Sequence, residues 1–180
     1  TLMMSMMENF FSIRKDSGAL FEGLAISEHE TFCREWMNQY PVLFVSFKDA
    51  EGEEFEGAYQ MLKTKLADLC KELAGIENEE PVNTADKHIF EKIMFGTAEK
   101  NEVKNSLKTI MRMLHAVYGR KVILLIDEYD VPLARASEKD TPENRYYPKM
   151  LDVIRGIMST TLKDNEFLQF AVITGCLRIA

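Results

Sequence analysis

The chain has 180 residues, of which 46% are hydrophobic and 28% are charged, and its formal net charge is −7 with a pI of about 5.1. This length favours one domain, 1–180, with room for a sizeable core. The composition is that of an ordinary globular protein. Because the acidic balance provides no global basic field, nucleic-acid binding is not indicated. No apolar stretch approaches the roughly 20 residues that span a bilayer, so no membrane segment is expected.

The cysteines and the amino-terminal segment bear on the compartment. Cys33, Cys70 and Cys176 lie far apart and show no metal-ligand spacing. An odd number without a disulfide framework is typical of a reducing compartment. The opening TLMMSMMENFF is apolar, but it has no basic flank before it and no small-residue cleavage site after it. We therefore expect a cytoplasmic protein.

The first predicted elements are helical. Apolar residues at helical spacing predict a helix over 2–11, whose methionines are expected to pack in the core. The glycine-containing segment 16–24 is expected to be a loop. A short helix follows, with Ser27 as its N-cap and Glu30 completing a capping box. The nearly continuous apolar run 42–47 then predicts the first strand.

The middle and the end of the chain alternate helices with strands. Helices are predicted over 55–73, 89–94, 107–118 and 150–162, and further strands over 122–126 and 168–173. The charged segment 134–148, with two prolines, is expected to be an exposed loop. Strands that are apolar on both faces and separated by helices predict a parallel sheet covered on two sides. The fold class is therefore α/β.

Acidic residues follow the second strand without a spacer. The run VILLI, 122–126, leads directly into Asp127 and Glu128, and Asp130 comes two positions later. In doubly wound α/β sheets, function gathers beyond the carboxyl ends of the strands. One carboxylate there would hold Mg²⁺, and the next would orient an attacking water. A single acid after a strand is equally well explained as a polar strand end, but this combination favours function.

The last strand brings a hydroxyl to the same edge. FAVITG ends in Thr174 and Gly175, and the following turn contains Arg178. The hydroxyl is suited to a phosphate oxygen or the attacking water, and the arginine to the charge that develops in phosphoryl transfer. Alone, each is better explained as a strand-end hydrogen bonder or a surface charge; with the acids they form a set. Ordinary loop roles are favoured for Ser46 and Lys48, at the end of the first strand.

The phosphate cradle of a P-loop protein is absent from the sequence. No segment matches Gly-x-x-x-x-Gly-Lys-Ser/Thr, in which backbone amides and the lysine hold the phosphates. The final hydroxyl residue of that motif is followed by a helix, and this chain opens with Thr1 followed by a predicted helix. Thr1 is therefore a candidate for the last residue of such a motif.

Several phrases together resemble a known family. LFEGLAIS, YPVLFVSFKD, YGRKVILLIDEYDVPL and TLKDNEFLQFAVITGCLRIA look like the bacterial AAA-ATPase-like family of P-loop proteins, with LIDEYD and ITGCLRIA the most specific. The resemblance covers nearly the whole chain. It implies a three-layer P-loop-NTPase-like parallel sheet with helices on both faces, and ATP and Mg²⁺ as cofactors. It also implies a nuclease module or another protein partner, because the family's domain often precedes a restriction-nuclease-like module.

The resemblance implies a role for each site residue. Thr1 aligns with the P-loop threonine and would bind Mg²⁺ and nucleotide. Asp127 is the Walker B acid that holds the metal, and Glu128 polarises the water. Thr174 lies at the sensor position, and Arg178 is a phosphate contact. Asp130 belongs to the family phrase, but no chemical role is assigned to it.

The sequence also departs from the family pattern. The P-loop lysine and glycines are absent from the 180 residues, and these residues contain no nuclease-like module. The resemblance implies that the missing P-loop strand lies beside 168–173, so the three predicted strands stay contiguous with 122–126 in the middle. The strand 168–173 would then have an unpaired backbone on the side where the missing strand belongs, and such an exposed edge strand predicts self-association. We expect the 180 residues alone to bind ATP weakly or not at all.

Three functions remain open at this stage. The leading interpretation is a P-loop ATPase or NTP-driven switch domain, which hydrolyses ATP in the complete protein. The alternative is a binding or regulatory module of the same fold that hydrolyses nothing, and a Gly-Lys motif ahead of Thr1 would separate the two. A nuclease metal site at Asp127, Glu128 and Asp130 is disfavoured, because no lysine follows these acids on the strand.

Overall fold

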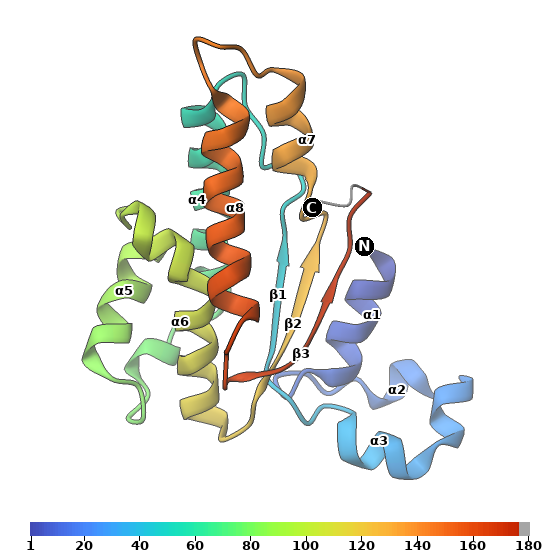
Figure 1. Ribbon diagram of the computed structural model, residues 1–180. Helices are drawn as coiled ribbons and strands as arrows, with labels where there is room; N and C mark the ends of the chain where they lie inside the picture. The colour runs from blue at the N-terminus through green and yellow to red at the C-terminus, as the bar shows by residue number, and fades with distance from the viewer. Residues whose placement is uncertain (177–180) are drawn as a thin grey trace.

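A parallel three-stranded sheet surrounded by helices forms the protein, and its computed structural model describes residues 1–176 (Figure 1). The strands are β1 (Val42–Ser46), β2 (Val122–Asp127) and β3 (Leu168–Ile173), in the order β1-β2-β3. The helices are α1 (Leu2–Phe11), α2 (Gly18–Phe21), η1 (Ala25–Glu28), α3 (Glu30–Trp36), α4 (Phe55–Glu72), η2 (Ile76–Asn78), α5 (Thr84–Met94), α6 (Lys100–Tyr118), α7 (Val131–Glu138) and α8 (Tyr146–Leu162). The α/β prediction is confirmed.

The central strand is the most deeply buried part of the sheet. Every side chain of Val122–Ile126 is 0% exposed, and β2 pairs in parallel with β1 on one side and β3 on the other. Burying one such aliphatic side chain contributes about 1.5–3 kcal/mol relative to leaving it exposed. The continuous apolar run thus selects the middle position, where both faces of a strand are covered.

Helices cover both faces of the sheet, because successive side chains of a strand point to opposite sides. On one face, Ile123 and Leu125 of β2 pack with Met4 of α1. On the other, Leu124 and Ile126 belong to the large core that α4, α5, α6 and α8 complete. Figure 1 shows α1 on the opposite side of the sheet from these four helices. The result is three layers, with α1 starting near the carboxyl end of β3.

Several local expectations are wrong. The Ser27 hydroxyl donates to the Leu24 carbonyl (2.7 Å) within η1, and α3 begins only at Glu30, so Ser27 is not its N-cap. The expected loop 16–24 contains α2. The expected loop 134–148 is confirmed only for 139–145, because α7 continues to Glu138 and α8 begins at Tyr146.

The methionines of α1 divide between core and surface. Met4 is 1% exposed and packs on the sheet, whereas Met3 is 66% and Met6 47% exposed. The expectation that this cluster packs in the core is therefore wrong for Met3 and Met6. An α-helix that lies on a sheet buries only the stripe that faces it, and these two side chains lie outside that stripe.

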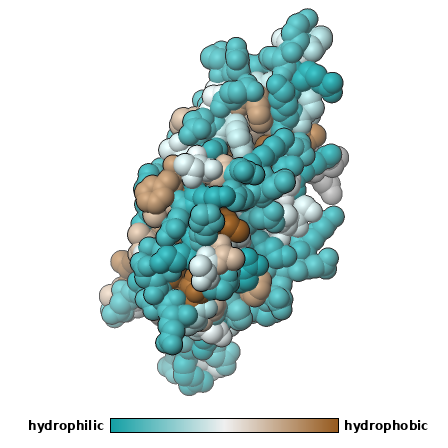
Figure 2. Space-filling model, turned by 90° about the vertical axis from the view of Figure 1, so that its left-hand side faces the viewer, coloured by the Kyte–Doolittle hydropathy of each residue, from teal (hydrophilic) through white to brown (hydrophobic). Residues whose placement is uncertain are grey.

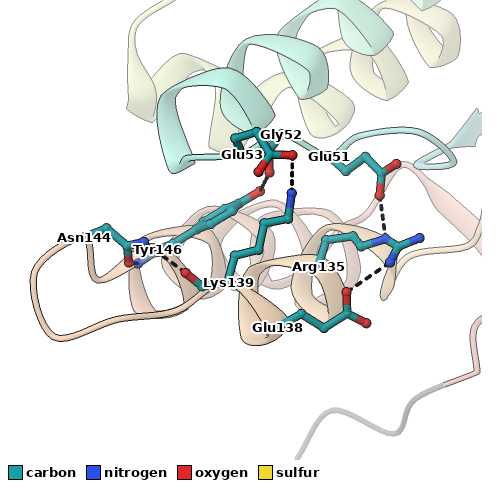
Figure 3. A network of polar contacts seen from close by, with 8 residues as sticks. All are labelled: Glu51, Gly52, Glu53, Arg135, Glu138, Lys139, Asn144 and Tyr146. Atoms are coloured by element: carbon teal, nitrogen blue, oxygen red, sulfur yellow. Dashed lines mark hydrogen bonds and ion pairs between the residues drawn. The ribbon is translucent and has the colours of Figure 1, made fainter.

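A polar network joins α7 to the loop after β1 (Figure 3). Arg135 Nε lies 2.6 Å from Glu51 Oε2, and Lys139 Nζ lies 2.5 Å from Glu53 Oε1. The Tyr146 hydroxyl donates to the Gly52 carbonyl (3.4 Å), and its ring is 0% exposed. Exposed ion pairs contribute little to stability, so burial of the Tyr146 ring is the main stabilising contribution of this connection.

The surface in Figure 2, on the side of α4 and α5, is mainly hydrophilic with scattered hydrophobic residues. Such isolated apolar side chains are normal on a globular surface. Within residues 1–176, the helices include none whose length and apolar character would let it cross a bilayer.

The contact between Tyr146 and the loop after β1 gives a stability prediction. Tyr146→Ala is expected to lower the free energy of unfolding by about 3–5 kcal/mol, because it leaves a cavity in the core. Lys139→Gln, which removes only an exposed ion pair, should lower it by less than about 1 kcal/mol. Urea unfolding followed by circular dichroism measures both. Equal losses for the two variants would contradict the assignment.

Candidate functional site at the carboxyl edge of the sheet

The centre of the candidate site is a contact between the ends of β2 and β3. The Thr174 hydroxyl donates a hydrogen bond to Asp127 Oδ1, and Asp127 is 2% exposed. Backbone hydrogen bonds extend the pairing beyond β3, from Thr174 N to the Ile126 carbonyl (2.9 Å) and from Tyr129 N to the Thr174 carbonyl (3.1 Å). The main chain therefore holds the two side chains together.

The first residue of the chain reaches the same carboxylate. Thr1 N lies 3.5 Å from Asp127 Oδ2, and Thr1 immediately precedes α1. Met4, one turn later, is buried against the sheet, which fixes the start of this helix over β2. Asp127 Oδ2 is buried and has no hydrogen-bond partner within the described residues. A buried carboxylate oxygen without a donor is unusual, and it marks a position where a cation or a donor fits.

The electrostatics of Asp127 are set by opposing effects. Burial raises its pKa, whereas the hydrogen bond from Thr174 and the interaction with Thr1 lower it. The lowering effects win, and the pKa of this carboxyl lies below its ordinary value of 3.8. Asp127 is therefore ionised at neutral pH, as a metal ligand must be.

Glu128 turns the chain at the end of β2. Its backbone is in the left-handed region, with φ 55°, and its carbonyl accepts a hydrogen bond from Val131 N (3.2 Å). A residue other than glycine costs about 1–2 kcal/mol in this conformation. Its half-buried carboxylate has no hydrogen bond or ion pair within residues 1–176. Local strain of this kind is typical of functional positions, where surrounding structure enforces it.

Asp130 has a role in the structure that sequence reasoning missed. Its carboxylate, on a residue that is 4% exposed, accepts a hydrogen bond from the Cys176 backbone N–H (2.8 Å) and so holds the chain after β3. A Cβ at Gly175 would lie 2.6 Å from Asp130 Oδ1 and 2.5 Å from the Tyr129 ring. Only glycine allows this close approach. The glycine directly after Thr174 was the available signal.

Ser46 and Arg178 are the other sequence candidates. Ser46 pairs opposite Asp127 in the β1–β2 register, but its hydroxyl accepts a hydrogen bond from Lys48 N (3.3 Å), which is an ordinary loop contact. Arg178 lies outside the described residues. The structure therefore brings together Thr1, Asp127 and Thr174, with Glu128 next to them along the chain.

The oxygens at this edge fit Mg²⁺. The described part of the chain contains no group of three or more His, Cys, Asp or Glu side chains arranged to hold a metal. Magnesium usually takes only one or two carboxylates from a protein and completes its shell with water and phosphate oxygens. Asp127 Oδ2, which has no hydrogen bond within the described residues, and the hydroxyl of Thr1 are hard oxygen ligands of the kind that such an ion requires.

Comparison with known proteins identifies the family. The chain matches the AAA-ATPase-like family, described as "Predicted AAA-ATPase", over residues 1–180, and it belongs to this family. It is also 25% identical over 159 residues to the "Uncharacterized protein in vnfD 5'region" of Azotobacter chroococcum mcd 1. That alignment covers 87% of this chain and 25% of the relative, so the chain spans about a quarter of the relative's length. No solved structure gives a significant match.

The hydrogen bond between Thr174 and Asp127 gives a pH-dependent prediction. Thr174→Val removes the donor and raises the pKa of Asp127, so the free energy of unfolding should fall by about 1–2 kcal/mol at pH 7. The pKa of Asp127 is lower in the folded state than in the unfolded state. The stabilisation is therefore fully present above the pKa of the unfolded state and is lost as pH falls through the pKa of the folded state. The deficit of the variant should therefore shrink below about pH 4.

Thr174→Ser is the matched control, since it keeps the hydroxyl, and it should follow the wild-type pH dependence. Urea unfolding between pH 3 and pH 7 provides the measurement. A deficit for Thr174→Val that is constant over this range would show that the contact does not stabilise the ionised carboxylate.

Proposed function

We propose that the chain is the magnesium-binding and water-activating part of a P-loop ATPase, with the phosphates of ATP at the carboxyl edge of β2 and β3. The observation that carries the proposal is the convergence of Thr1 and Thr174 on the buried carboxylate of Asp127, one oxygen of which has no hydrogen-bond partner within the described residues. Membership of the AAA-ATPase-like family supports a general ATPase-like function.

Each residue has a distinct task in this proposal. Asp127, as a Walker B acid, and Thr1, as the last residue of a P-loop, hold Mg²⁺, which neutralises phosphate charge when bound. Thr174 keeps Asp127 oriented and ionised, and it contacts a phosphate oxygen or the attacking water as a sensor. Glu128 orients the water, and Arg178 contacts the phosphates.

The geometry of Glu128 supports a separation between metal binding and water activation. Asp127 and Glu128 are adjacent, but the left-handed backbone of Glu128 turns the chain out of the strand. The carboxylate of Asp127 is engaged by Thr174, whereas that of Glu128 is free of hydrogen bonds and ion pairs within residues 1–176. A group that has to accept a proton or position a water is better placed when it is not already held by a donor.

The phosphate cradle is absent from these 180 residues, so most contacts to a triphosphate have to come from other residues of the full-length protein. The sequence resemblance points to a nuclease-like module or another protein as the partner that hydrolysis drives. A cytoplasmic location belongs to the same proposal.

The ATPase proposal predicts different effects for the two acids in the full-length protein. Glu128→Gln should lower kcat for ATP hydrolysis by about 100-fold or more while leaving ATP binding nearly unchanged, because only water activation is lost. Asp127→Asn should weaken magnesium-dependent ATP binding and also abolish turnover. Phosphate release and calorimetric titration, with and without Mg²⁺, measure the two effects.

Glu166→Gln is the matched control, because Glu166 is exposed and lies just before the amino end of β3, at the other end of the strand from Thr174. It should leave both quantities unchanged. The 180 residues alone should bind ATP weakly or not at all, and tight binding by them would contradict the need for a separate cradle. Absence of ATP binding by the full-length protein would favour the alternative, a regulatory module of the same fold that hydrolyses nothing.

A further inference from the structure

An apolar groove lies beside α1, on a part of the molecule that the ATPase proposal does not use. It has a volume of about 510 Å³ and is lined only by apolar side chains, among them Leu2, Met3 and Met6 of α1 and Phe21, Leu24 and Phe32 from the segment after it. Six of the nine exposed large hydrophobic side chains of residues 1–176 lie in this first part of the chain. Such a concentration marks an interaction surface.

The floor of the groove consists of packed aromatic rings, whereas its rim contains adaptable methionines. Phe10 and Phe21, each 6% exposed, meet edge to face with ring centroids 5.1 Å apart, and Phe10 stacks on Phe32 at 5.8 Å. The rim contains Met3 and Met6, whose unbranched side chains adjust to the shape of a partner. An aromatic floor with a methionine rim is suited to the apolar face of a helix.

The charges around the groove identify the kind of helix. Segment 16–35 contains five acidic residues and a single basic one, Arg34. Glu28, Glu30 and Glu35 line a shallow depression that adjoins the groove at Phe32. These three side chains and Glu22 have no ion pair or hydrogen bond with other groups of the described residues. They are therefore available to cations of a partner.

We propose that this groove binds an amphipathic helix whose apolar face is flanked by lysine or arginine residues. The apolar face fills the groove along α1, and the flanking cations meet the glutamates of segment 16–35. The same charges disfavour two other occupants. A second copy that offered its own groove would place acid against acid, and an anionic lipid surface would be repelled.

Binding is tested on the full-length protein with a fluorescent helical peptide of about 18 residues, or five turns. Leucines form one face of the peptide and lysines the other, and a matched peptide has glutamate in place of every lysine. We expect the lysine peptide to bind at least about 10-fold more tightly than the glutamate peptide, with an affinity that falls as salt is added. Fluorescence anisotropy measures both. Equal affinities for the two peptides would overturn the proposal.

Variants locate the peptide on the surface. Met6→Glu and Leu24→Glu place a charge in the groove at positions that are 47% and 45% exposed, and each should weaken the lysine peptide about 10-fold or more. Phe95→Glu is the matched control, because Phe95 is 74% exposed at the end of α5, outside the groove, and it should change the affinity less than about 2-fold. Unfolding midpoints equal to wild type establish that the variants fold.

Charge reversal distinguishes the contribution of the acidic residues to peptide affinity from that of the apolar groove. Glu28→Lys should weaken the lysine peptide and strengthen the glutamate peptide, since only the sign of the border changes. Light scattering and flotation with anionic vesicles test the other occupants. A dimer or vesicle binding that Met6→Glu abolishes would assign the groove to a second copy or to a membrane and would overturn the proposal.

Discussion

The hydrogen bond from the Thr174 hydroxyl to the Asp127 carboxylate is the contact on which the candidate site depends. It joins the ends of two neighbouring parallel strands, and the backbone bond from Tyr129 N to the Thr174 carbonyl extends the pairing beyond them. The carboxyl ends of neighbouring parallel strands lie side by side. A hydroxyl and a carboxylate that each follow an apolar strand are therefore brought together by the strand pairing itself. The phrases LIDEYD and ITGCLRIA contain these two partners.

The strands and their shared edge were predictable because burial leaves a strong signal. A strand covered on both faces has to be apolar at every position, and the run 122–126 shows this directly. Asp127 and Thr174 could be placed together for the same reason. The boundary between α7 and α8 was not predictable from charge and proline content, because helix formation there depends on Tyr146 and Met150, which are buried by distant parts of the chain.

Local geometry around the site was also beyond the sequence pattern. The amino-acid sequence does not indicate that Glu128 adopts a left-handed backbone conformation. The need for glycine at position 175 becomes clear only from its close approach to Tyr129 and Asp130 in the structure. For the methionines of α1, the sequence predicted the helix but not which side chains are buried. Their spacing predicted a helix correctly, but four methionines in five residues cannot all face one sheet, and the pattern alone does not say which ones turn outward.

Helix α1 has both of its ends tied down. Thr1, directly before the helix, contacts Asp127. At the other end the backbone pairs with Tyr40, through Ile13 N to the Tyr40 carbonyl (2.8 Å) and Tyr40 N to the Phe11 carbonyl (3.0 Å). Ten helical residues span about 15 Å, and the apolar groove runs along this length, so the helix connects the groove to the Asp127 site. A ligand that bound the groove and displaced α1 would also change the affinity of the Asp127 site for its own ligand. Thermodynamic linkage then requires the ligand at Asp127 to change the affinity of the groove by the same factor.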